Sequence, residues 1–397
     1  MPSSLEKFPV RYDVHKYLGR KPWYIVYNLI ARFSKRGNTV LDLFSGSGVA
    51  SFEALRLDRN VIAVDYSSLS ELIVKTLCSY HNISEFDRAL QSLTKKLKSI
   101  EHVYYVNSIQ GEGLLEYWIP DQHKGKLIIG NTEKIINNIS ETDFTHSEEV
   151  KDFKWKHERT QIPKIPCSNV STWGEIFSNR AQYVLHNALG YIKSISDSNI
   201  RNALLVALSA SLEKIALLNH FKSIGEGWIR EKPICYYKPQ DYIEFNAIKA
   251  LENKAAKMRM AIIETNNLLE KSHGSFSFIR EHAENLNYKT KFDLIIMDPP
   301  YLSEVPYDKL EALHDIWLGF KPENQNIHKA FDQIALKSYN ALSDRGILVL
   351  LLLNYQKESR EFFVNKLANN GFVKLKETRN YLGSKEGLSI SVFKKSN

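Results

Sequence analysis

The stretch Val40-Leu41-Asp42-Leu43-Phe44-Ser45-Gly46-Ser47-Gly48 decides the fold of this chain. A short apolar run leads into a loop with two alternating glycines, and residues 49–57 continue with the apolar periodicity of a helix. Glycines let the backbone approach a ligand closely, and the amino end of the helix that follows is its positive end. We therefore expect a strand, a ligand-binding loop and a helix in direct succession.

A second strand with an acidic end extends this pattern. Residues 61–64 are Val-Ile-Ala-Val, and Asp65 follows them. An acid at the end of the second strand is placed to accept hydrogen bonds from ribose hydroxyls. The third glycine of the dinucleotide fingerprint is missing, because Ser51 lies where it is expected. Taken alone, the pattern is that of any nucleotide-binding βαβ unit.

A proline-rich tetrapeptide marks the end of another strand. Asp298-Pro299-Pro300-Tyr301 directly follows the apolar residues 292–297. The two prolines end the strand and stiffen the loop, because each ring fixes φ and removes an N–H group. In an open α/β sheet, ligands bind at this carboxyl edge. The loop could grip a flat molecule that bears an amino group; the alternative is a proline-stiffened turn without such a role.

Together these motifs resemble those of S-adenosylmethionine-dependent methyltransferases that act on adenine N6 or cytosine N4 in DNA. The resemblance lies in residues 42–48, in Asp65 and in residues 298–301, and it extends to residues 15–23, which resemble the N-terminal cofactor motif of the family. The order of the motifs is similar to the alpha arrangement: cofactor motif first, recognition insertion next, catalytic loop last. Residues 172–180 and 301–319 also resemble segments of a DNA methylase group with a long insertion.

The resemblance implies roles for the residues of the catalytic loop. The Asp298 carboxylate and the Pro299 carbonyl would accept hydrogen bonds from the target amino group. Pro300 would keep the loop rigid, and Tyr301 would stack on a base that is flipped out of the duplex. No metal is needed for this chemistry.

The resemblance also implies S-adenosylmethionine as the cofactor and a set of residues that bind it. The family often has an acid after the third strand, and His282 occupies that position here. Either Glu281 or His282 contacts the adenine amino group, or neither does. The implied cofactor-binding residues are Lys16, Tyr17, Arg20, Asp42, Phe44, Gly46, Gly48, Asp65, Tyr66 and His282.

The expected fold is α/β, a Rossmann-like class I methyltransferase with a seven-stranded mixed sheet. Residues 275–279 and 294–297 are expected to form the third and fourth strands. Residues 347–353 form the fifth, which is continuous and apolar like a buried parallel strand. Residues 371–377 and 388–393 would close the sheet as a hairpin.

A long insertion separates the cofactor motif from the catalytic loop. We expect a catalytic domain from residues 1–86 and 272–397 and a largely helical target-recognition domain from residues 87–271. Within the insertion, residues 104–156 are polar and irregular in pattern, with one strand-like run at 126–129. Long helices are expected at residues 179–195, 200–218 and 246–269.

The insertion also carries basic residues interleaved with aromatic ones, as a nucleic-acid-binding face requires. The alternative is solvated helix faces with a few core aromatics. Neutralising Arg230 and Lys232 is expected to weaken DNA binding. The candidate residues are Arg180, Arg201, Lys214, His220, Lys222, Arg230, Lys232 and Lys238, with Trp228, Tyr236 and Tyr237.

Composition is compatible with this interpretation. The 397 residues are 25% charged and 43% hydrophobic, and the net charge of +8 favours a polyanionic partner. No apolar run is long enough to span a bilayer, and the N-terminus does not resemble a secretion signal. We therefore expect a cytoplasmic protein without a membrane partner. Cys78, Cys167 and Cys235 are far apart in the sequence, and we expect them to be reduced and structural.

Several functions remain open at this point. The first is a site-specific DNA methyltransferase acting on adenine N6 in double-stranded DNA, in a restriction-modification or phage-defence setting with a possible cognate restriction endonuclease. Cytosine N4 in DNA and a guanine amino group in RNA are alternative targets. An inactive nucleic-acid-binding specificity subunit is a further alternative.

Overall fold

The computed structural model describes residues 9–17, 19–145, 148–221, 228–230, 235–300, 307–321, 326–353, 357–382 and 386–396. The chain divides into two compact units. Unit 1 contains Met1–Tyr80, Ala261–Val305 and Glu323–Asn397, and unit 2 contains His81–Met260 and Pro306–Pro322. These boundaries differ from those expected at residues 86/87 and 271/272. The expected division also leaves 306–322 in the catalytic domain, whereas these residues cluster with the insertion.

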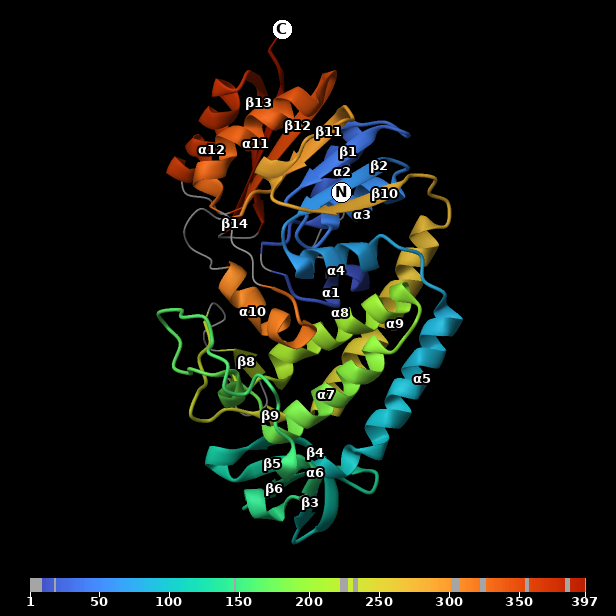
Figure 1. Cartoon of the computed structure of the whole chain (residues 1–397), viewed down its shortest axis with the longest axis vertical. Coiled ribbons are helices and arrows are strands. Elements are labelled where there is room, and N and C mark those ends of the chain that lie inside the picture. Colours follow the sequence, from blue (N-terminus) through green and yellow to red (C-terminus); the bar gives the residue numbers. More distant parts are fainter. Residues whose placement is uncertain are drawn as a thin grey trace. The chain divides into compact units, whose positions relative to one another are not determined.

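A seven-stranded sheet forms the centre of unit 1 (Figure 1). Its order is β10-β2-β1-β11-β12-β14-β13. The first five strands in this order are parallel to one another, and β14 is antiparallel to both β12 and β13. The expected seven-stranded mixed sheet of a class I methyltransferase is therefore confirmed. The strands are β1 Thr39–Leu43, β2 Asn60–Asp65, β10 Phe276–Arg280, β11 Phe292–Met297, β12 Leu342–Leu353, β13 Phe372–Leu382 and β14 Glu386–Lys395.

Helices cover both faces of this sheet because its central strands are apolar on both sides. Val40 and Leu294 belong to one hydrophobic cluster, and Leu41 and Ile295 to the other. Successive strand residues point to opposite faces, so each face receives its own core. One face packs against α2 (Trp23–Phe33), α3 (Val49–Arg56) and α4 (Ser68–Leu77), and the other against α11 (Ile327–Ala341) and α12 (Lys357–Asn369). The short α1 (Val10–Asp13) precedes them.

Long helices make up most of unit 2 (Figure 1). The three that the sequence predicts are present as α7 (Asn179–Lys193), α8 (Ser198–Ile215) and α9 (Ala247–Leu269), which continues into unit 1. The helix α10 (Tyr307–Leu318) also belongs to this unit, although it follows the proline loop in sequence. The remaining helices are α5 Ile83–Ser99 and α6 Glu148–Asp152.

Unit 2 also contains a five-stranded antiparallel sheet in the region expected to be irregular. That expectation is wrong, because tight turns join short strands that share a small apolar core. Gly130 has φ +61° and lies in the two-residue turn between β5 and β6. Leu115, Leu127 and Ile136 of three successive strands are buried. The strands are β3 Tyr105–Ser108, β4 Gly111–Ile119, β5 Lys124–Ile129, β6 Thr132–Asn137 and β9 Glu244–Phe245; β7 Asn219–Phe221 and β8 Trp228–Arg230 form a separate hairpin.

Two of the cysteines are joined within unit 2. Cys167 and Cys235 form a disulfide, with Cα atoms 5.8 Å apart, while Cys78 is free and buried. The expectation of three reduced cysteines is therefore wrong, because a sequence separation of 68 residues does not reveal that the two loops meet. Among the described residues, no helix has both the length and the apolar character needed to cross a bilayer.

Candidate functional site

The glycine loop after β1 is held in a conformation that side chains rarely adopt. Gly46 and Gly48 have φ values of +51° and +76°, and Phe44 has +63° despite its side chain. A Cβ atom on Gly46 would lie 3.0 Å from Cε1 of Tyr17, so a larger residue would displace that ring. Strain of this kind is typical of functional sites. The loop thus brings together four of the residues expected at the cofactor site: Tyr17, Phe44, Gly46 and Gly48.

Asp65, at the end of β2, stabilises the glycine loop by hydrogen bonds. Its Oδ2 atom accepts a hydrogen bond from the Gly46 amide at 2.8 Å, and its Oδ1 atom accepts one from the Ser67 amide at 3.0 Å. Burial raises the pKa of the Asp65 carboxyl, and these amides oppose the rise. The carboxylate has lone pairs beyond the two that it uses here.

Asp42 lies almost completely buried inside β1, with 2% of its surface exposed. The Ser51 hydroxyl donates a hydrogen bond to its Oδ2 atom at 2.6 Å. Ser51 occupies the position of the missing third glycine, so this partner explains the departure from the dinucleotide fingerprint. Burial raises the pKa of Asp42 to about 7, and the nearby charges of Asp298 and Asp65 contribute to the rise.

Asp298 follows β11 at the same edge of the sheet. Met297 is in register with Leu43 of β1, so the proline loop and the glycine loop leave neighbouring strands at one level. The Lys21 ammonium contacts the Asp298 carboxylate at 2.5 and 2.6 Å and also donates to the Gly19 carbonyl at 2.8 Å. Burial raises the pKa of Asp298, and Lys21 opposes this effect.

Lys21 is a residue that sequence reasoning missed. It lies within residues 15–23, which resemble the cofactor motif, but the motif gives it no role of its own. Lys21 is only 5% exposed. A lysine that is nearly buried requires an acidic partner. The separation of 277 residues hides that partner in the sequence.

The rings of Tyr66 and His282 form a flat stack at the ends of β2 and β10. Their centroids are 5.1 Å apart, and their planes differ by 5°. The neighbouring Glu281 carboxylate accepts from the His282 amide at 2.9 Å and from Asn285 Nδ2 at 2.9 Å. The Glu281 carboxylate thus forms hydrogen bonds within its own loop, whereas His282 lies beside Tyr66, another residue expected to bind the cofactor.

The other residues expected in the site differ in their exposure and in their hydrogen-bond partners. Lys16 is exposed, and its carbonyl contacts His15 Nδ1 at 2.7 Å. Arg20 Nη2 donates to the His15 carbonyl at 2.5 Å, which fixes this turn. Pro299 is buried and Pro300 half-buried, whereas Tyr301 lies outside the described residues.

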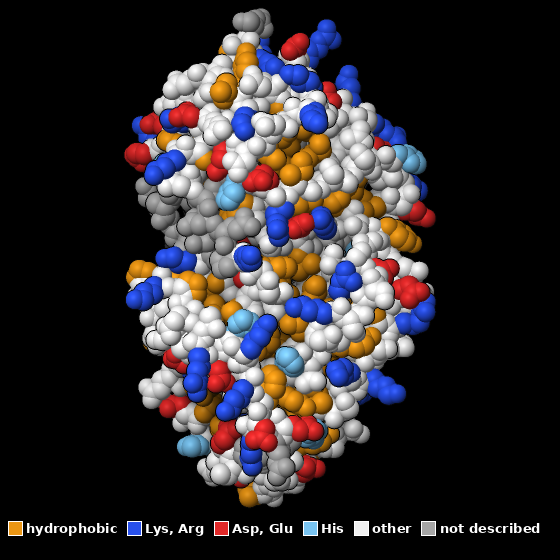
Figure 2. All heavy atoms as spheres, in the orientation of Figure 1, with side chains coloured by type: hydrophobic (Ala, Val, Ile, Leu, Met, Phe, Trp, Pro, Cys, Tyr) orange, Lys and Arg blue, Asp and Glu red, His pale blue; other side chains and the backbone are white. Residues whose placement is uncertain are grey.

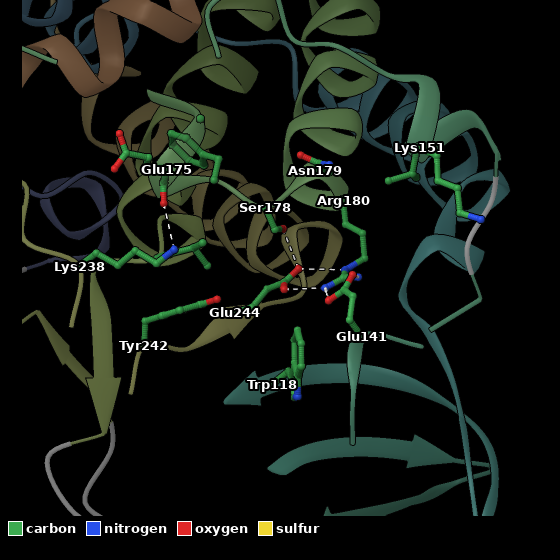
Figure 3. A pocket seen from close by; sticks show the side chains of 14 residues that line it. Trp118, Glu141, Lys151, Glu175, Ser178, Asn179, Arg180, Lys238, Tyr242 and Glu244 are labelled. Atoms are coloured by element: carbon green, nitrogen blue, oxygen red, sulfur yellow. Dashed lines mark hydrogen bonds and ion pairs between the residues drawn. The ribbon is translucent and has the colours of Figure 1, made fainter. Parts of the chain in front are cut away.

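Unit 2 contains a separate cavity of about 430 Å³ (Figure 3). Several of its charged groups bond within the protein: Arg180 pairs with Glu244, and Lys238 Nζ donates to the Glu175 carbonyl at 3.1 Å. No set of polar groups that converges on a ligand is evident among the described residues of this cavity. The candidate active site is therefore the carboxyl edge of the sheet in unit 1.

The N-terminal part of the chain is similar in sequence to known DNA methylases. Residues 4–75 match the model of a DNA methylase family that covers adenine-N6 and cytosine-N4 enzymes. The Type II methyltransferase M.MjaII of Methanocaldococcus jannaschii is 20% identical over 229 residues, which are 55% of this chain and 42% of that protein. The chain is similar to N6/N4 DNA methylases over these N-terminal residues. It spans less than half the length of this curated relative.

Solved structures resemble this chain only distantly. A TehB-like S-adenosylmethionine-dependent methyltransferase from Corynebacterium glutamicum is 8% identical, with a TM-score of 0.32, over 94% of this chain and 87% of that chain. TrmN from Thermus thermophilus is 10% identical, with a TM-score of 0.32, over 94% of this chain and 48% of that one. Neither likeness is close enough to carry a functional argument.

The similarity to DNA methylases implies S-adenosylmethionine as the cofactor, and the acidic residues of the site fit it. Asp42, Asp65 and Asp298 all have raised pKa values, so a cationic ligand would favour their charged forms. S-adenosylmethionine carries a sulfonium and an ammonium group. At Gly46 the Tyr17 ring takes the space that a Cβ atom would fill, so a side chain does not fit at this position of the loop.

The raised pKa of Asp42 predicts that the stability of the folded protein depends on pH. The folded protein keeps a proton on Asp42 up to about pH 7, whereas the ordinary value is 3.8. The stability contributed by this proton is therefore present at low pH and is lost as the pH rises through 7. Asp42→Asn removes the titration, so its unfolding free energy relative to wild type should increase from pH 5.5 to 8.5. Parallel pH dependences in urea titrations would contradict this expectation.

Proposed function

We propose that this protein transfers a methyl group from S-adenosylmethionine to adenine N6 at a specific site in double-stranded DNA. The observation that carries the proposal is the position of Asp298, which follows β11 beside the glycine loop and is held by Lys21. A rigid carboxylate at this edge suits a ligand with an amino group. S-adenosylmethionine, when bound, supplies an electrophilic methyl group on a positively charged sulfur.

The protein's own part in this reaction is to prepare the target nitrogen. The lone pair of an exocyclic amino group is delocalised into the base, which makes the group a poor nucleophile. The Asp298 carboxylate accepts one of its hydrogens and the Pro299 carbonyl accepts the other, so the lone pair becomes localised. Positioning and electrostatics supply most of the barrier reduction. Tyr301 stacks on the base once it has been flipped from the duplex.

Cytosine N4 is the second candidate target, because the family includes both activities. The catalytic loop would hold either amino group in the same way. A guanine amino group in RNA is less well supported, because the matching family model describes DNA methylases. A non-catalytic specificity subunit is less well supported, because Lys21 holds the Asp298 carboxylate in place. A restriction-modification or defence role, with a partner nuclease, is proposed from the family alone.

The deciding experiment supplies labelled S-adenosylmethionine together with separate DNA and RNA pools. After digestion to nucleosides, the label should appear in N6-methyladenine from DNA. Label in N4-methylcytosine would select the second target, and label only in RNA would replace the proposal. Absence of transfer by folded protein to every pool would support the non-catalytic alternative.

Three of the basic residues that the sequence suggests for DNA contact are engaged in bonds within unit 2. Arg180 is buried between carboxylates, Arg201 Nη1 donates to the Ile195 carbonyl, and Arg230 Nη2 donates to the Cys235 carbonyl at 2.8 Å. These three side chains stabilise the fold, and Lys232 lies outside the described residues. Acidic and basic side chains are interspersed on the face shown in Figure 2, so net charge alone does not mark a DNA surface.

The segment 151–164 is a better candidate for phosphate contacts. Lys154, Lys156 and Arg159 are exposed on it, and the Arg159 side chain is 93% exposed. Burial lowers the pKa of Lys193, and the nearby charge of Lys156 lowers it further. Positive charge therefore accumulates at this place. A polyanion would relieve this repulsion.

Replacing Lys154, Lys156 and Arg159 together with glutamine should therefore weaken DNA binding. The slope of log K against log salt should fall by about 0.9 for each phosphate that the variant no longer neutralises. The matched control replaces Lys95, Lys96 and Lys98 with glutamine. These lysines are exposed on α5, and their replacement changes the net charge by the same amount. Equally weakened binding in both triple variants, measured by salt titration, would show a general charge effect and move the interface elsewhere.

A further inference from the structure

Hydrogen bonds hold each peptide group of the glycine loop between residues 44 and 49. The Ser45 amide donates to the Val64 carbonyl at 2.9 Å, and the Ser45 carbonyl accepts from the Gly48 amide at 2.8 Å. The Gly48 carbonyl accepts from the Phe52 amide at 2.9 Å. These three bonds join backbone to backbone. The two peptide groups on either side of Gly46 are bonded to side chains.

Those side chains, Asp65 and Ser70, belong to a closed ring of hydrogen bonds. The Ser70 hydroxyl donates to the Gly46 carbonyl at 2.8 Å, and the Gly46 amide donates to Asp65 Oδ2 at 2.8 Å. Asp65 Oδ1 accepts from the Ser67 amide at 3.0 Å, and the Ser67 hydroxyl accepts from the Ser70 amide at 3.1 Å. The ring lies entirely in unit 1 and joins the glycine loop to the end of β2 and to the first turn of α4.

Ser70 reaches the loop from the interior of unit 1. It has no exposed surface, so its hydroxyl is a fixed part of the protein interior. Ser67 caps α4 by accepting the Ser70 amide, which fixes the backbone from which the Ser70 side chain projects. Burial raises the pKa of the Asp65 carboxyl, and the Ser70 hydroxyl is among the groups that oppose this rise. One buried side chain therefore acts on both the glycine loop and the acid at the end of β2.

Gly46 is the residue of the loop that most needs such a partner. Glycine lacks a Cβ atom, so the peptide group that follows it can adopt several orientations. The donor at its carbonyl selects one of them. The Tyr17 ring lies against Gly46 on another side, where a Cβ atom would be 3.0 Å from Tyr17 Cε1. A changed orientation at Gly46 would therefore affect Tyr17 and Asp65, two residues expected to bind the cofactor.

We propose that Ser70 is a positioning residue of the cofactor site: its hydroxyl closes the hydrogen-bond ring and so holds Gly46 and Asp65 in the geometry that receives S-adenosylmethionine. The inference rests on the cofactor of the proposed function. Ser70 acts through the Gly46 carbonyl, so it does not have to touch the cofactor itself. Without the ring, part of the binding energy would be used to order the loop, and the affinity for the cofactor would fall.

The test is Ser70→Ala in the full chain, with S-adenosylmethionine as the ligand. Alanine keeps the amide that donates to Ser67 and favours a helix, so α4 should stay intact. The Kd measured by calorimetry should rise about threefold to tenfold, as expected for one lost hydrogen bond. The KM for the cofactor should rise by a similar factor, while kcat at saturating cofactor and the KM for DNA change less than twofold. Amide exchange in residues 45–48 should accelerate, with no change in β1.

The matched control is Thr76→Val, which removes another buried hydroxyl from α4 and keeps the shape of the side chain. That hydroxyl donates to the Leu72 carbonyl at 2.7 Å, within the helix rather than to the loop. The Kd for the cofactor should stay at the wild-type value in this variant. Ser70→Cys is a second variant that fills the space of serine, but a thiol is only a weak donor. It should also weaken cofactor binding, and it supplies the same measurement if Ser70→Ala does not fold.

Calorimetry separates this inference from the proposed function, because cofactor binding does not require methyl transfer. An unchanged Kd in folded Ser70→Ala or Ser70→Cys would overturn the role of Ser70 alone. Equal losses of affinity in Ser70→Ala and Thr76→Val would also overturn it, because they would reflect general loosening of α4. If the wild type binds the cofactor but transfers no methyl group, the proposed function fails, and a raised Kd in Ser70→Ala still supports the role of Ser70. A folded wild type that binds no S-adenosylmethionine would overturn both.

Discussion

Asp298→Ala is expected to abolish methyl transfer while leaving S-adenosylmethionine affinity close to that of wild type. The carboxylate acts on the target amino group, so its loss removes an acceptor that matters most in the transition state. Loss of one preorganised electrostatic partner typically costs about 100- to 1,000-fold in kcat. Single-turnover transfer of labelled methyl groups, with calorimetry of cofactor binding, measures the two effects separately.

Lys21 has to be included in the design, because Asp298→Ala leaves its ammonium nearly buried without this carboxylate. Asp298→Asn keeps the size of the side chain, and Asp298→Ala with Lys21→Met removes both charges. All three variants should lack transfer. Near wild-type turnover in any of them would refute the assignment of Asp298, whereas loss of cofactor binding in all three would place Asp298 at the cofactor instead.

The single variant Lys21→Met tests the electrostatic role of this lysine. Burial already raises the pKa of Asp298, and Lys21 lowers it. Removing Lys21 should therefore raise this pKa further, so a larger share of Asp298 is protonated and a poor acceptor at neutral pH. Transfer should be weak near neutrality and recover as the pH rises, while Lys21→Arg keeps the wild-type profile.

Local signals in the sequence predict the catalytic core well. The strand, glycine loop, helix and acid of residues 40–65 follow one another directly, and their periodicities are distinct. The proline loop ends β11 because two consecutive prolines cannot continue a strand. Each of these features depends on neighbours within a few residues, so a single sequence contains the necessary information.

Features that depend on distant partners escape sequence reasoning. Lys21 and Asp298 meet across 277 residues, and α10 leaves the unit in which its sequence neighbours lie. The strands β3 and β6 are short and contain several polar residues, so their pattern resembles a loop. A basic residue such as Arg180 looks like a phosphate contact until its carboxylate partners are known. In each case the missing information is the identity of a spatial neighbour.

Glu244→Ala should strongly destabilise unit 2. Arg180 is 5% exposed and Glu244 is 2% exposed, and they form a bidentate pair with distances of 3.0 and 2.7 Å (Figure 3). Glu141 contacts the same guanidinium at 2.5 Å from a more exposed position. Removing Glu244 leaves the guanidinium buried with a single, partly solvated partner. Breaking a buried pair in this way costs about 3–5 kcal/mol of unfolding free energy.

The matched control is Asp87→Ala, because Asp87 and Arg259 form a bidentate pair with similar distances of 2.7 and 2.8 Å on the surface of unit 2. Their side chains are 32% and 43% exposed, so water screens the interaction and its loss should cost at most about 1 kcal/mol. Urea titrations that follow unit 2 measure both variants. Equal destabilisation by the two would contradict the assignment of Arg180 to a buried structural network and restore it as a candidate for DNA contact. The difference expected between them follows from burial alone, since the two pairs share the same chemistry and nearly the same geometry.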